Sequence, residues 1–406
     1  MKTKAIVPPK LADPCNQDVK IKAQKVILGF KKEVVEFIIR LRILRIVLRH
    51  FKNPLKVLKI LKTLDSNRRK ISGPGRVNKF IKINGRYFWN LYIPGSNSLA
   101  FDRFFEGEIN RISPILKKTN RFSNIFIAFT KKCPLKCEHC FEWDVINKKE
   151  KLRLNDIQTI IKKFQLKGVA QVQITGGEPM LRVDDIVEMV QSSHNVTDFW
   201  VLTSGFNLTY ANAQKLKLAG LTGVVISLDH FDPDRHNMFR GYKNSYQWVE
   251  EAVKNSIDSN LVTALSICVT KSFVSESNLM RYAELAKKLG VSFVQVLEPK
   301  SLGHYSGKNV QLPPDQEKIL EEFFLKMNFD KRFRDFPIIT YHGYYQRRVG
   351  CFGAGNRHLY IDTDGDIHPC PFCPAKAGNA LEDSLDYSLP VLQSKGCQLY
   401  NDTNIR

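Results

Sequence analysis

The sequence contains no run of 18 uncharged apolar residues, the length that typifies a membrane-spanning helix. The start of the chain, from Met1 to Lys25, has no apolar segment of the kind found in a secretory signal. Acidic residues are scarce, because 40 Asp and Glu stand against 62 Lys and Arg, and the net charge is +22. This imbalance predicts an anionic partner, which is membrane lipid, nucleic acid or an acidic peptide.

The chain is long enough, at 406 residues with 43% apolar content, for two or three domains or for one large α/β domain with extensions. It has nine cysteines, an odd number, and three of them lie close together. Clustered cysteines without an export signal indicate a reducing compartment and metal ligation rather than disulfides. We therefore expect a cytoplasmic protein with bound metal.

The N-terminal quarter is basic. Residues 1–19 are expected to be a loose leader, in which Cys15 has no partner motif. Residues 20–70 carry sixteen Lys and Arg against three acids, a net charge of +13. They show a helical period in which leucines at three-residue steps alternate with lysines, as in Leu55–Leu64. Two interpretations stay open: these helices lie on an anionic membrane surface, or they pack as a cap on the main domain.

Residues 71–123 are expected to form a hairpin and a helix. Asn84-Gly85 suits the tight turn between strands at Phe80–Ile83 and Arg86–Ile93, and a helix is predicted over Phe101–Ile112. The hairpin also carries four aromatic residues, Tyr87, Phe88, Trp89 and Tyr92. They are interpreted either as ordinary packing or as a wall facing the substrate.

Strands and helices alternate over residues 124–300. The predicted strands are Ile125–Thr130, Val169–Thr175, Asp198–Thr203, Gly223–Leu228, Val262–Thr270 and Ser292–Leu297. The predicted helices are 154–166, 183–193, 210–219, 245–258 and 276–289. Apolar, β-branched strands separated by helices predict a parallel sheet. Six such units are fewer than the eight of a closed barrel, so the predicted fold class is α/β with a partial (β/α)6 TIM-like barrel.

The carboxyl ends of these strands are where a site is expected. After the first strand comes T-K-K-C-P-L-K-C-E-H-C, which places Cys133, Cys137 and Cys140 in a C-x3-C-x2-C spacing. Three thiolates can hold one face of an iron–sulfur cluster and leave one iron open. The other strand ends supply candidate ligand contacts at Gly176, Gly177, Glu178, Ser204, Ser227, Asp229, Arg240 and Leu297. Their hydroxyls and carboxylates suit a ribose or an ammonium group, and the guanidinium suits a carboxylate.

The C-x3-C-x2-C motif, followed one strand later by Gly-Gly-Glu-Pro, resembles the radical S-adenosylmethionine (SAM) superfamily over residues 124–300. The resemblance implies that the three cysteines bind a [4Fe–4S] cluster and that SAM chelates its fourth iron. It further implies the following contacts to SAM: Gly176, Gly177 and Glu178 at the amino group, Ser227 and Asp229 at the ribose or carboxylate, Arg240 at the carboxylate, and Leu297 and His139 at the adenine.

Plainer interpretations of the same residues remain. The cysteine trio could be a structural zinc site with His139 as fourth ligand, although the Gly-Gly-Glu-Pro context speaks against it. Ser204 is equally a turn former, and Asp229 is alternatively a helix cap. Cys268 lies inside a predicted strand, where a free cysteine is expected to be a small buried hydrophobe.

A second cysteine group lies near the C-terminus, after a predicted linker with one helix at 301–349. The spacing Cys351-x13-Gly365-x4-Cys370, followed by Cys373, resembles the start of the SPASM and twitch extensions of radical SAM enzymes. The resemblance implies one auxiliary [4Fe–4S] cluster in residues 350–406, with Cys397 as a candidate fourth ligand. The alternative is a zinc knuckle made by the same thiols.

The resemblance implies an enzyme that cleaves SAM reductively to a 5′-deoxyadenosyl radical, which abstracts a substrate hydrogen. A reductant such as flavodoxin or ferredoxin is implied. We expect the substrate to be a peptide or protein side chain; the alternative is a membrane-associated lipid or isoprenoid, for which 20–70 would attach the protein to the inner face of the membrane. RNA modification is less expected, because the basic residues lie in an Ile- and Leu-rich stretch rather than among aromatics. A non-catalytic protein that binds SAM and an iron–sulfur cluster is the remaining alternative.

Overall fold

The computed structural model describes residues 24–73, 75–115, 123–351, 353, 355–382 and 385–395. Cys15 and Cys397 therefore lie outside the described residues. A nine-stranded sheet forms the centre, in the order β10-β9-β8-β7-β6-β5-β4-β11-β12. Its strands are β4 (Asn124–Ala128), β5 (Gln171–Thr175), β6 (Asp198–Thr203), β7 (Gly223–Ser227), β8 (Val262–Cys268), β9 (Phe293–Leu297), β10 (Ile338–Tyr341), β11 (His358–Ile361) and β12 (Ile367–His368).

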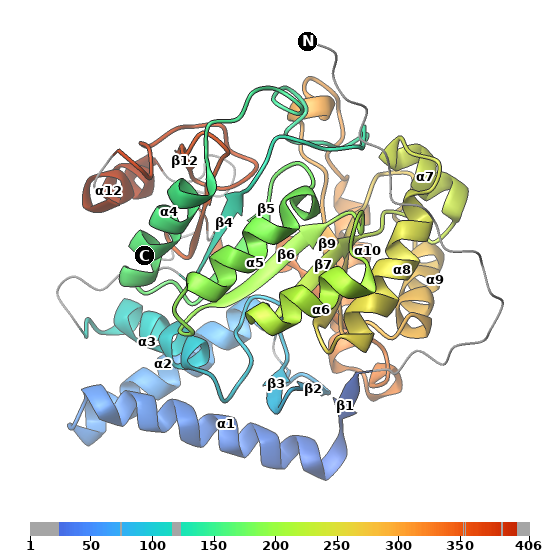
Figure 1. Cartoon of the computed structure of the whole chain (residues 1–406). Helices are drawn as coiled ribbons and strands as arrows, with labels where there is room; N and C mark the ends of the chain where they lie inside the picture. The colour runs from blue at the N-terminus through green and yellow to red at the C-terminus, as the bar shows by residue number, and fades with distance from the viewer. Residues whose placement is uncertain are drawn as a thin grey trace.

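All neighbouring strands from β10 to β11 are parallel, and only β12 is antiparallel. The strand order ends in two free edges, β10 and β12, so the curved sheet does not close into a complete barrel. The outer face is covered by helices (Figure 1): α4 (Leu154–Leu166), α5 (Val183–Ser192), α6 (Tyr210–Ala219), α8 (Ser245–Asp258), α9 (Glu276–Lys288) and α10 (Pro314–Phe329). The predicted partial TIM-like barrel is confirmed, with its six predicted strands forming β4 to β9.

The barrel has more strands than the sequence analysis predicted. Residues 301–349, predicted as a linker with one helix, also contain β10, which pairs in parallel with β9, and α11 (His342–Val349). The C-terminal region also joins the same sheet, because β11 pairs in parallel with β4. The last helix is α12 (Leu385–Lys395).

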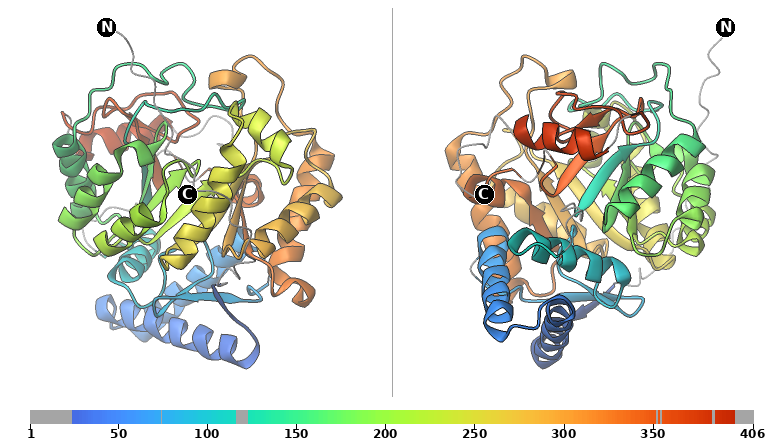
Figure 2. Two further views of the ribbon diagram at one scale, coloured as in Figure 1. Left: turned by 45° about the vertical axis from the view of Figure 1, so that its right-hand side comes forward. Right: turned by 90° about the vertical axis from the view of Figure 1, so that its left-hand side faces the viewer.

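An N-terminal layer lies across the amino ends of the barrel strands (Figure 2). It consists of the antiparallel strands β1 (Lys25–Ile27), β2 (Phe80–Ile83) and β3 (Arg86–Phe88) and the helices α1 (Gly29–His50), α2 (Pro54–Ser72) and α3 (Leu99–Ile112). The turn between β2 and β3 has positive φ at Asn84 and Gly85, as a tight primed turn requires. β3 ends at Phe88 rather than at the predicted Ile93, because a turn follows in which the Asn90 side chain accepts a hydrogen bond from the Tyr92 amide.

The hairpin and the helices have different roles at this end of the barrel. Apolar side chains of the hairpin, including Ile81 and Phe88, pack against Trp200 and Phe293 of the barrel strands and seal part of its floor. The helices form a separate core in which α1 contributes Val35 and Ile39. No helix among the described residues is long and apolar enough to cross a membrane.

Candidate active site

One cavity of about 1030 Å³ connects the two ends of the barrel. Its lining begins at Leu44 of α1 and Leu64 of α2, passes Val225 in β7, and reaches Cys133 and Glu178 at the carboxyl ends of the strands. The cavity is therefore open to the N-terminal layer as well as to the cysteine loop. Its volume is at the upper end of the range for small-molecule and cofactor sites, which is about 300–1,000 Å³.

The cysteine loop after β4 is held by backbone hydrogen bonds from two sides of the barrel mouth. The loop after β5 donates from Gly177 to the Thr130 carbonyl and from Glu178 to the Lys132 carbonyl, both at 2.7 Å. On the opposite side, the amide of Glu138 donates to the carbonyl of Phe239 at the end of α7 (Pro233–Arg240), at 2.9 Å. These contacts fix the backbone from which the three predicted ligand thiols project.

A third segment, just after β9, completes the support of this loop. The His304 amide donates to the Cys140 carbonyl at 2.9 Å, and the His304 ring lies stacked on Trp143 at 3.9 Å between centroids. Gly303 has φ +54, and a Cβ there would lie 2.3 Å from the Cys140 carbonyl oxygen. This contact was not predicted, because residues 301–349 were expected to be a linker with one helix; the Leu302-Gly303 break was the available signal.

The cysteine loop lies so close to Gly176 and Gly177 that neither position has room for a side chain. Gly176 has φ +124, and a Cβ there would lie 2.6 Å from the Thr130 carbonyl oxygen. A Cβ on Gly177 would lie 2.3 Å from the Lys132 carbonyl oxygen. Both glycines also line the cavity. The close approach that requires them is between two protein loops, whereas the sequence suggested an approach to a ligand.

Glu178 is buried and accepts four hydrogen bonds. One carboxylate oxygen accepts from the Met180 amide and the Thr203 hydroxyl, and the other accepts from the Ser204 amide and hydroxyl, at 2.5–3.0 Å. Burial raises the pKa of Glu178, and these donors oppose the rise. Ser204 thus acts as a partner of Glu178, and its amide and hydroxyl help to hold the ends of β5 and β6 together.

Asp229 and Arg240 form a buried ion pair beside the cysteines. Asp229 Oδ2 lies 2.6 Å from Arg240 Nε, and Arg240 Nη1 donates to the Cys137 sulfur at 3.6 Å. Burial alone would raise the pKa of Asp229, but the Arg240 charge and neighbouring groups hold it below its usual value. The helix-cap interpretation of Asp229 is wrong, since Asp232 caps α7 by accepting from the Arg235 amide.

The remaining predicted contacts line the same cavity. Ser227 and Leu297 stand at the ends of β7 and β9, and His139 lies within the cysteine loop. The His139 ring is 5.0 Å from that of Phe239, and burial lowers its pKa to about 4, so the ring is uncharged at neutral pH. Its Nδ1 has no hydrogen-bond partner among the described residues. Cys268 is buried, as predicted.

The three thiols of the cysteine loop suit a cluster better than a single zinc ion. All three line the cavity, and burial raises the pKa of each thiol, to about 12 for Cys140. Among the described residues, no group of three or more Cys, His, Asp or Glu side chains is arranged to hold one metal ion, as tetrahedral zinc requires. A trio of thiols that lines one cavity fits the ligand set of an iron–sulfur cluster.

The second cysteine group lies against the first. Cys351 and Cys370 line the same cavity, and the Cys373 amide donates to the Cys370 carbonyl at 3.1 Å in a tight loop. Phe372 in that loop contacts Phe141, which follows Cys140, with 5.8 Å between ring centroids. The predicted fourth ligand, Cys397, lies outside the described residues.

The middle of the cavity is lined by hairpin aromatics, which the sequence offered as one of two interpretations, and by two residues that were not predicted, Gln295 and His342. Of the four hairpin aromatics, Trp89 and Tyr92 line it, and the Tyr92 hydroxyl accepts a hydrogen bond from the Gln295 side chain of β9. His342 also lines it, with its ring 4.9 Å from that of Tyr92. The available signal was a polar glutamine inside an otherwise apolar strand.

The class defined by this fold and site agrees with comparisons against known proteins. The family model described as "Radical SAM superfamily" matches residues 127–286. A "Probable GTP 3′,8-cyclase" of Saccharolobus solfataricus is 31% identical over 258 residues, which are 60% of this chain and 81% of that protein. The "GTP 3′,8-cyclase" of Yersinia pestis is 25% identical over 280 residues, 65% of this chain and 84% of that protein.

Solved structures show the same fold. A tagged form of anSMEcpe with bound AdoMet has a TM-score of 0.55 and 18% identity, covering 68% of this chain and 83% of that one. Streptococcus suis SuiB bound to precursor peptide SuiA has a TM-score of 0.52 and 17% identity, covering 69% of this chain and 65% of that one. The chain belongs to the radical SAM superfamily, whose members carry a [4Fe–4S] cluster and bind SAM.

Proposed function

We propose that this radical SAM protein uses Cys133, Cys137 and Cys140 to hold a [4Fe–4S] cluster and abstracts a hydrogen from an apolar, lipid- or isoprenoid-like substrate held in the cavity. When bound and reduced by a flavodoxin- or ferredoxin-type donor, the cluster supplies the electron that splits SAM into methionine and a 5′-deoxyadenosyl radical. The protein itself binds and orients both molecules and excludes water.

The paired charges around the cysteines support this assignment of roles. Arg240 is held by Asp229 and places a guanidinium against the Cys137 sulfur, which favours the thiolate form that a cluster ligand needs. In the same proposal Ser227 and Leu297 contact the nucleoside part of SAM. Glu178 reaches the SAM amino group when the Thr203 or Ser204 hydroxyl turns away, since its four lone-pair sites are already used.

The proposed substrate class rests on the chemistry of the cavity lining. Between the two ends it is mostly aromatic and aliphatic: Phe80, Trp89, Tyr92, Phe104, Phe105, Phe126, Leu202, Val225, Ile338 and Tyr345. The histidines there are uncharged, because burial lowers the pKa of His342 to about 4 and that of His358 to about 3. Such a surface favours an apolar chain over the peptide that the sequence led us to expect.

A nucleoside triphosphate, suggested by the names of the relatives, fits this lining less well. Three phosphates need several cations that are not already neutralised. The cations that line the cavity are each paired with an acid: Arg240 with Asp229, Arg357 with Glu108, Arg40 and Arg76 with Glu36, Arg68 and Arg69 with Asp65, and Lys300 with Glu298. A guanosine triphosphate would therefore have to break existing ion pairs.

The auxiliary cluster is part of the same proposal. Cys351, Cys370 and Cys373 are its proposed ligands, and two of them face the cavity. A cluster at that position would border the substrate and could take up an electron from it. Iron and sulfide counting after anaerobic reconstitution tests this, because two [4Fe–4S] clusters hold about eight irons and one holds about four.

The substrate class is tested by adding three candidates separately to the reconstituted protein with SAM and dithionite. The candidates are vesicles made from the lipids of the native organism, a mixed peptide library, and GTP. We expect the lipid vesicles to raise the rate of 5′-deoxyadenosine formation above the rate without substrate. A rise with peptides or with GTP, and none with lipid, would overturn the proposed substrate class.

A further inference from the structure

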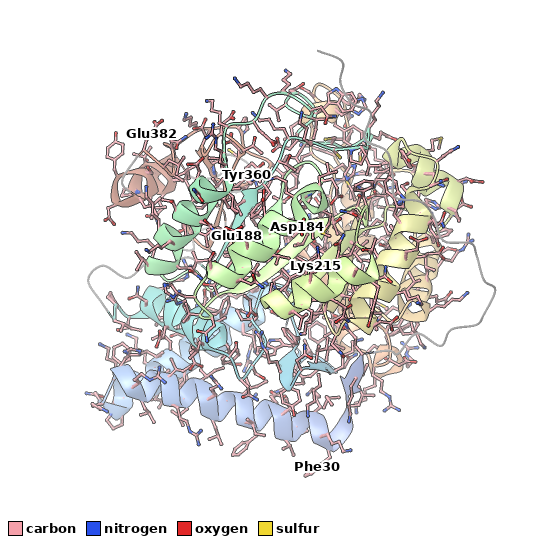
Figure 3. The ribbon with its side chains drawn as sticks, viewed as in Figure 1. Phe30, Asp184, Glu188, Lys215, Tyr360 and Glu382 are labelled. Carbon is pink, nitrogen blue, oxygen red and sulfur yellow. The ribbon has the colours of Figure 1, made fainter. Side chains whose placement is uncertain are left out.

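The outward face of α1 is apolar and has no protein partner among the described residues. Phe30 is 82% exposed, Phe37 61%, Ile38 46%, Leu48 42% and Val34 41%. At 100° per residue these positions fall on one stripe, opposite the buried face that packs into the N-terminal layer. We call these five residues the outer stripe. Figure 3 shows Phe30 at the lower edge of the molecule, pointing away from it.

Exposed cations flank the outer stripe. Lys31, Arg40, Arg45 and Arg49 of α1 are exposed, and the adjoining α2 exposes Lys56, Lys59, Lys62 and Lys70 together with Leu55 and Leu58. The two helices carry only three acids, Glu33, Glu36 and Asp65, and each is paired with a basic side chain. An amphipathic helix with Phe, Leu and Ile on one stripe and Lys and Arg beside it matches the chemistry of an anionic lipid surface. A protein partner would have to supply both a matching apolar groove and many acids.

The stripe is also continuous with the mouth of the cavity. Phe37 belongs to the outer stripe and lines the cavity. Beside it, α1 contributes Leu41 and Leu44 to the lining, together with the ion pair of Glu36 and Arg40. Leu61 and Leu64 of α2 line the opposite side of this mouth. From there the apolar lining continues to the cysteines, a path of roughly 25 Å if a helical layer about 10 Å thick is added to a five-residue strand.

We infer that the outer stripe docks on an anionic membrane and that the mouth between α1 and α2 receives an apolar chain directly from the lipid layer. The uptake of an apolar chain from the lipid layer rests on the proposed function. Docking on the membrane rests only on the exposed outer stripe and the cations beside it. In this arrangement α1, about 33 Å long at 22 residues, lies in the plane of the interface. The substrate then never crosses water on its way to the cysteine end.

Vesicle flotation of the full chain tests docking. Wild type is expected to float with phosphatidylcholine vesicles that contain phosphatidylglycerol, to float weakly with phosphatidylcholine alone, and to be released as salt is raised. Phe30→Glu/Ile38→Glu should lower the bound fraction at least about tenfold, because two apolar anchors become anions. Neither residue lines the cavity.

The matched control is Leu166→Glu/Leu218→Glu, which makes the same charge change at residues 78% and 82% exposed on other helices. It should float like wild type, and thermal melting should show that both variants fold. Equal loss of flotation in both double variants, or no flotation of wild type, overturns the docking surface. The docking proposal is also overturned if wild type is a dimer that does not bind vesicles and Phe30→Glu/Ile38→Glu makes it a monomer. In that case the outer stripe serves self-association.

Cleavage of SAM in the absence of vesicles separates the two proposals. Both double variants should form 5′-deoxyadenosine at the wild-type rate, because their substitutions lie far from the cysteines. Wild type that cleaves SAM but does not float overturns the docking alone. Wild type that floats but does not cleave SAM overturns the proposed function and leaves the docking in place.

Discussion

The two ends of the cavity are built in different ways. At the cysteine end, three separate loops hold the backbone by hydrogen bonds, and glycines allow contacts that any side chain would block. At the N-terminal end, α1 is attached mainly by side-chain packing and by partly exposed ion pairs such as Arg42 with Asp102. Backbone clamps resist local opening more than side-chain packing at a surface does. We therefore expect the cysteine end to be a rigid reaction site. We expect the N-terminal end, where the substrate enters and which we call the receiving end, to adjust to its substrate.

The largest effect is expected at the rigid end. Cys133→Ala, Cys137→Ala or Cys140→Ala should each abolish dithionite-dependent 5′-deoxyadenosine formation and lower the iron content by about four atoms, because each removes a cluster ligand. Mass spectrometry and iron analysis measure the two results. Cys268→Ala is the control, because Cys268 is not one of the three ligands and contacts Asp229 through its backbone amide, which the substitution keeps, so both iron and cleavage should be retained. Full cleavage by any of the three variants would contradict the assignment.

Next in size is an effect confined to the receiving end. Leu44→Trp/Leu64→Trp should narrow the mouth and reduce product formed from vesicle-borne substrate about tenfold or more, while cleavage of SAM without substrate continues, since the cysteines are untouched. Product and 5′-deoxyadenosine are measured in the same reaction. Leu58→Trp, on the exposed face of α2 and outside the lining, should behave like wild type. Equal loss of product in the control would show that the mouth is not the route.

A smaller effect concerns the second cysteine group. Cys351→Ala/Cys370→Ala should reduce iron from about eight to about four atoms and uncouple cleavage from product formation, leaving 5′-deoxyadenosine detectable. Iron analysis with electron paramagnetic resonance checks this. An unchanged iron content would remove the auxiliary cluster from the account.

The smallest effect concerns the ion pair that joins the N-terminal layer to the barrel. Glu108 on α3 is buried and pairs with Arg357, which precedes β11, at 2.9 Å, and with Arg111 at 3.1 Å. Burial would raise the pKa of Glu108, but the two guanidinium groups lower it from 4.5 to about 2. Its contribution to stability is therefore complete above about pH 4.5 and is lost as the pH falls towards 2.

Glu108→Gln should cost about 3 kcal/mol at pH 7, because it removes the buried carboxylate that pairs with two largely buried guanidinium groups. Denaturant unfolding between pH 7 and pH 3 measures this, and the variant should lose less stability on acidification than wild type. Lys215→Gln, which removes an exposed ion pair with Asp184, is the control and should change stability by less than about 0.5 kcal/mol. Parallel pH curves for wild type and Glu108→Gln would contradict the role of this ion pair.

Local signals predicted the barrel and the place of the site. Apolar strands such as Gly223–Ser227 and the C-x3-C-x2-C spacing can be read over a few residues, and the carboxyl ends of parallel strands must converge. β10 was not foreseen, because a four-residue strand carries little periodicity. The sequence shows β11 as the first strand of a hairpin, but its pairing with β4 was not foreseen, because the two strands are distant in sequence.

Contacts between residues that are distant in sequence could not be predicted for the same reason. The residues around Gly177 do not reveal its close contact with the Lys132 carbonyl, which leaves no room for a side chain. Nor do the residues around Glu178 reveal that Thr203 and Ser204 donate hydrogen bonds to its carboxylate. The continuity of the cavity also depends on where α1 and α2 settle against the barrel, which is set by packing between distant segments. The sequence offered membrane binding and packing as alternatives for these helices. The structure shows one packed face on α1, and our docking proposal assigns the opposite face to the membrane.

The most direct test of the account is transfer of deuterium. Vesicles made from uniformly deuterated lipids of the native organism are incubated with the reconstituted protein, SAM and dithionite, and 5′-deoxyadenosine is analysed by mass spectrometry. We predict deuterium in the 5′-deoxyadenosine formed by wild type, and much less in that formed by Leu44→Trp/Leu64→Trp. Rapid formation of 5′-deoxyadenosine without deuterium, in the presence of these vesicles, would contradict an apolar substrate received from the membrane.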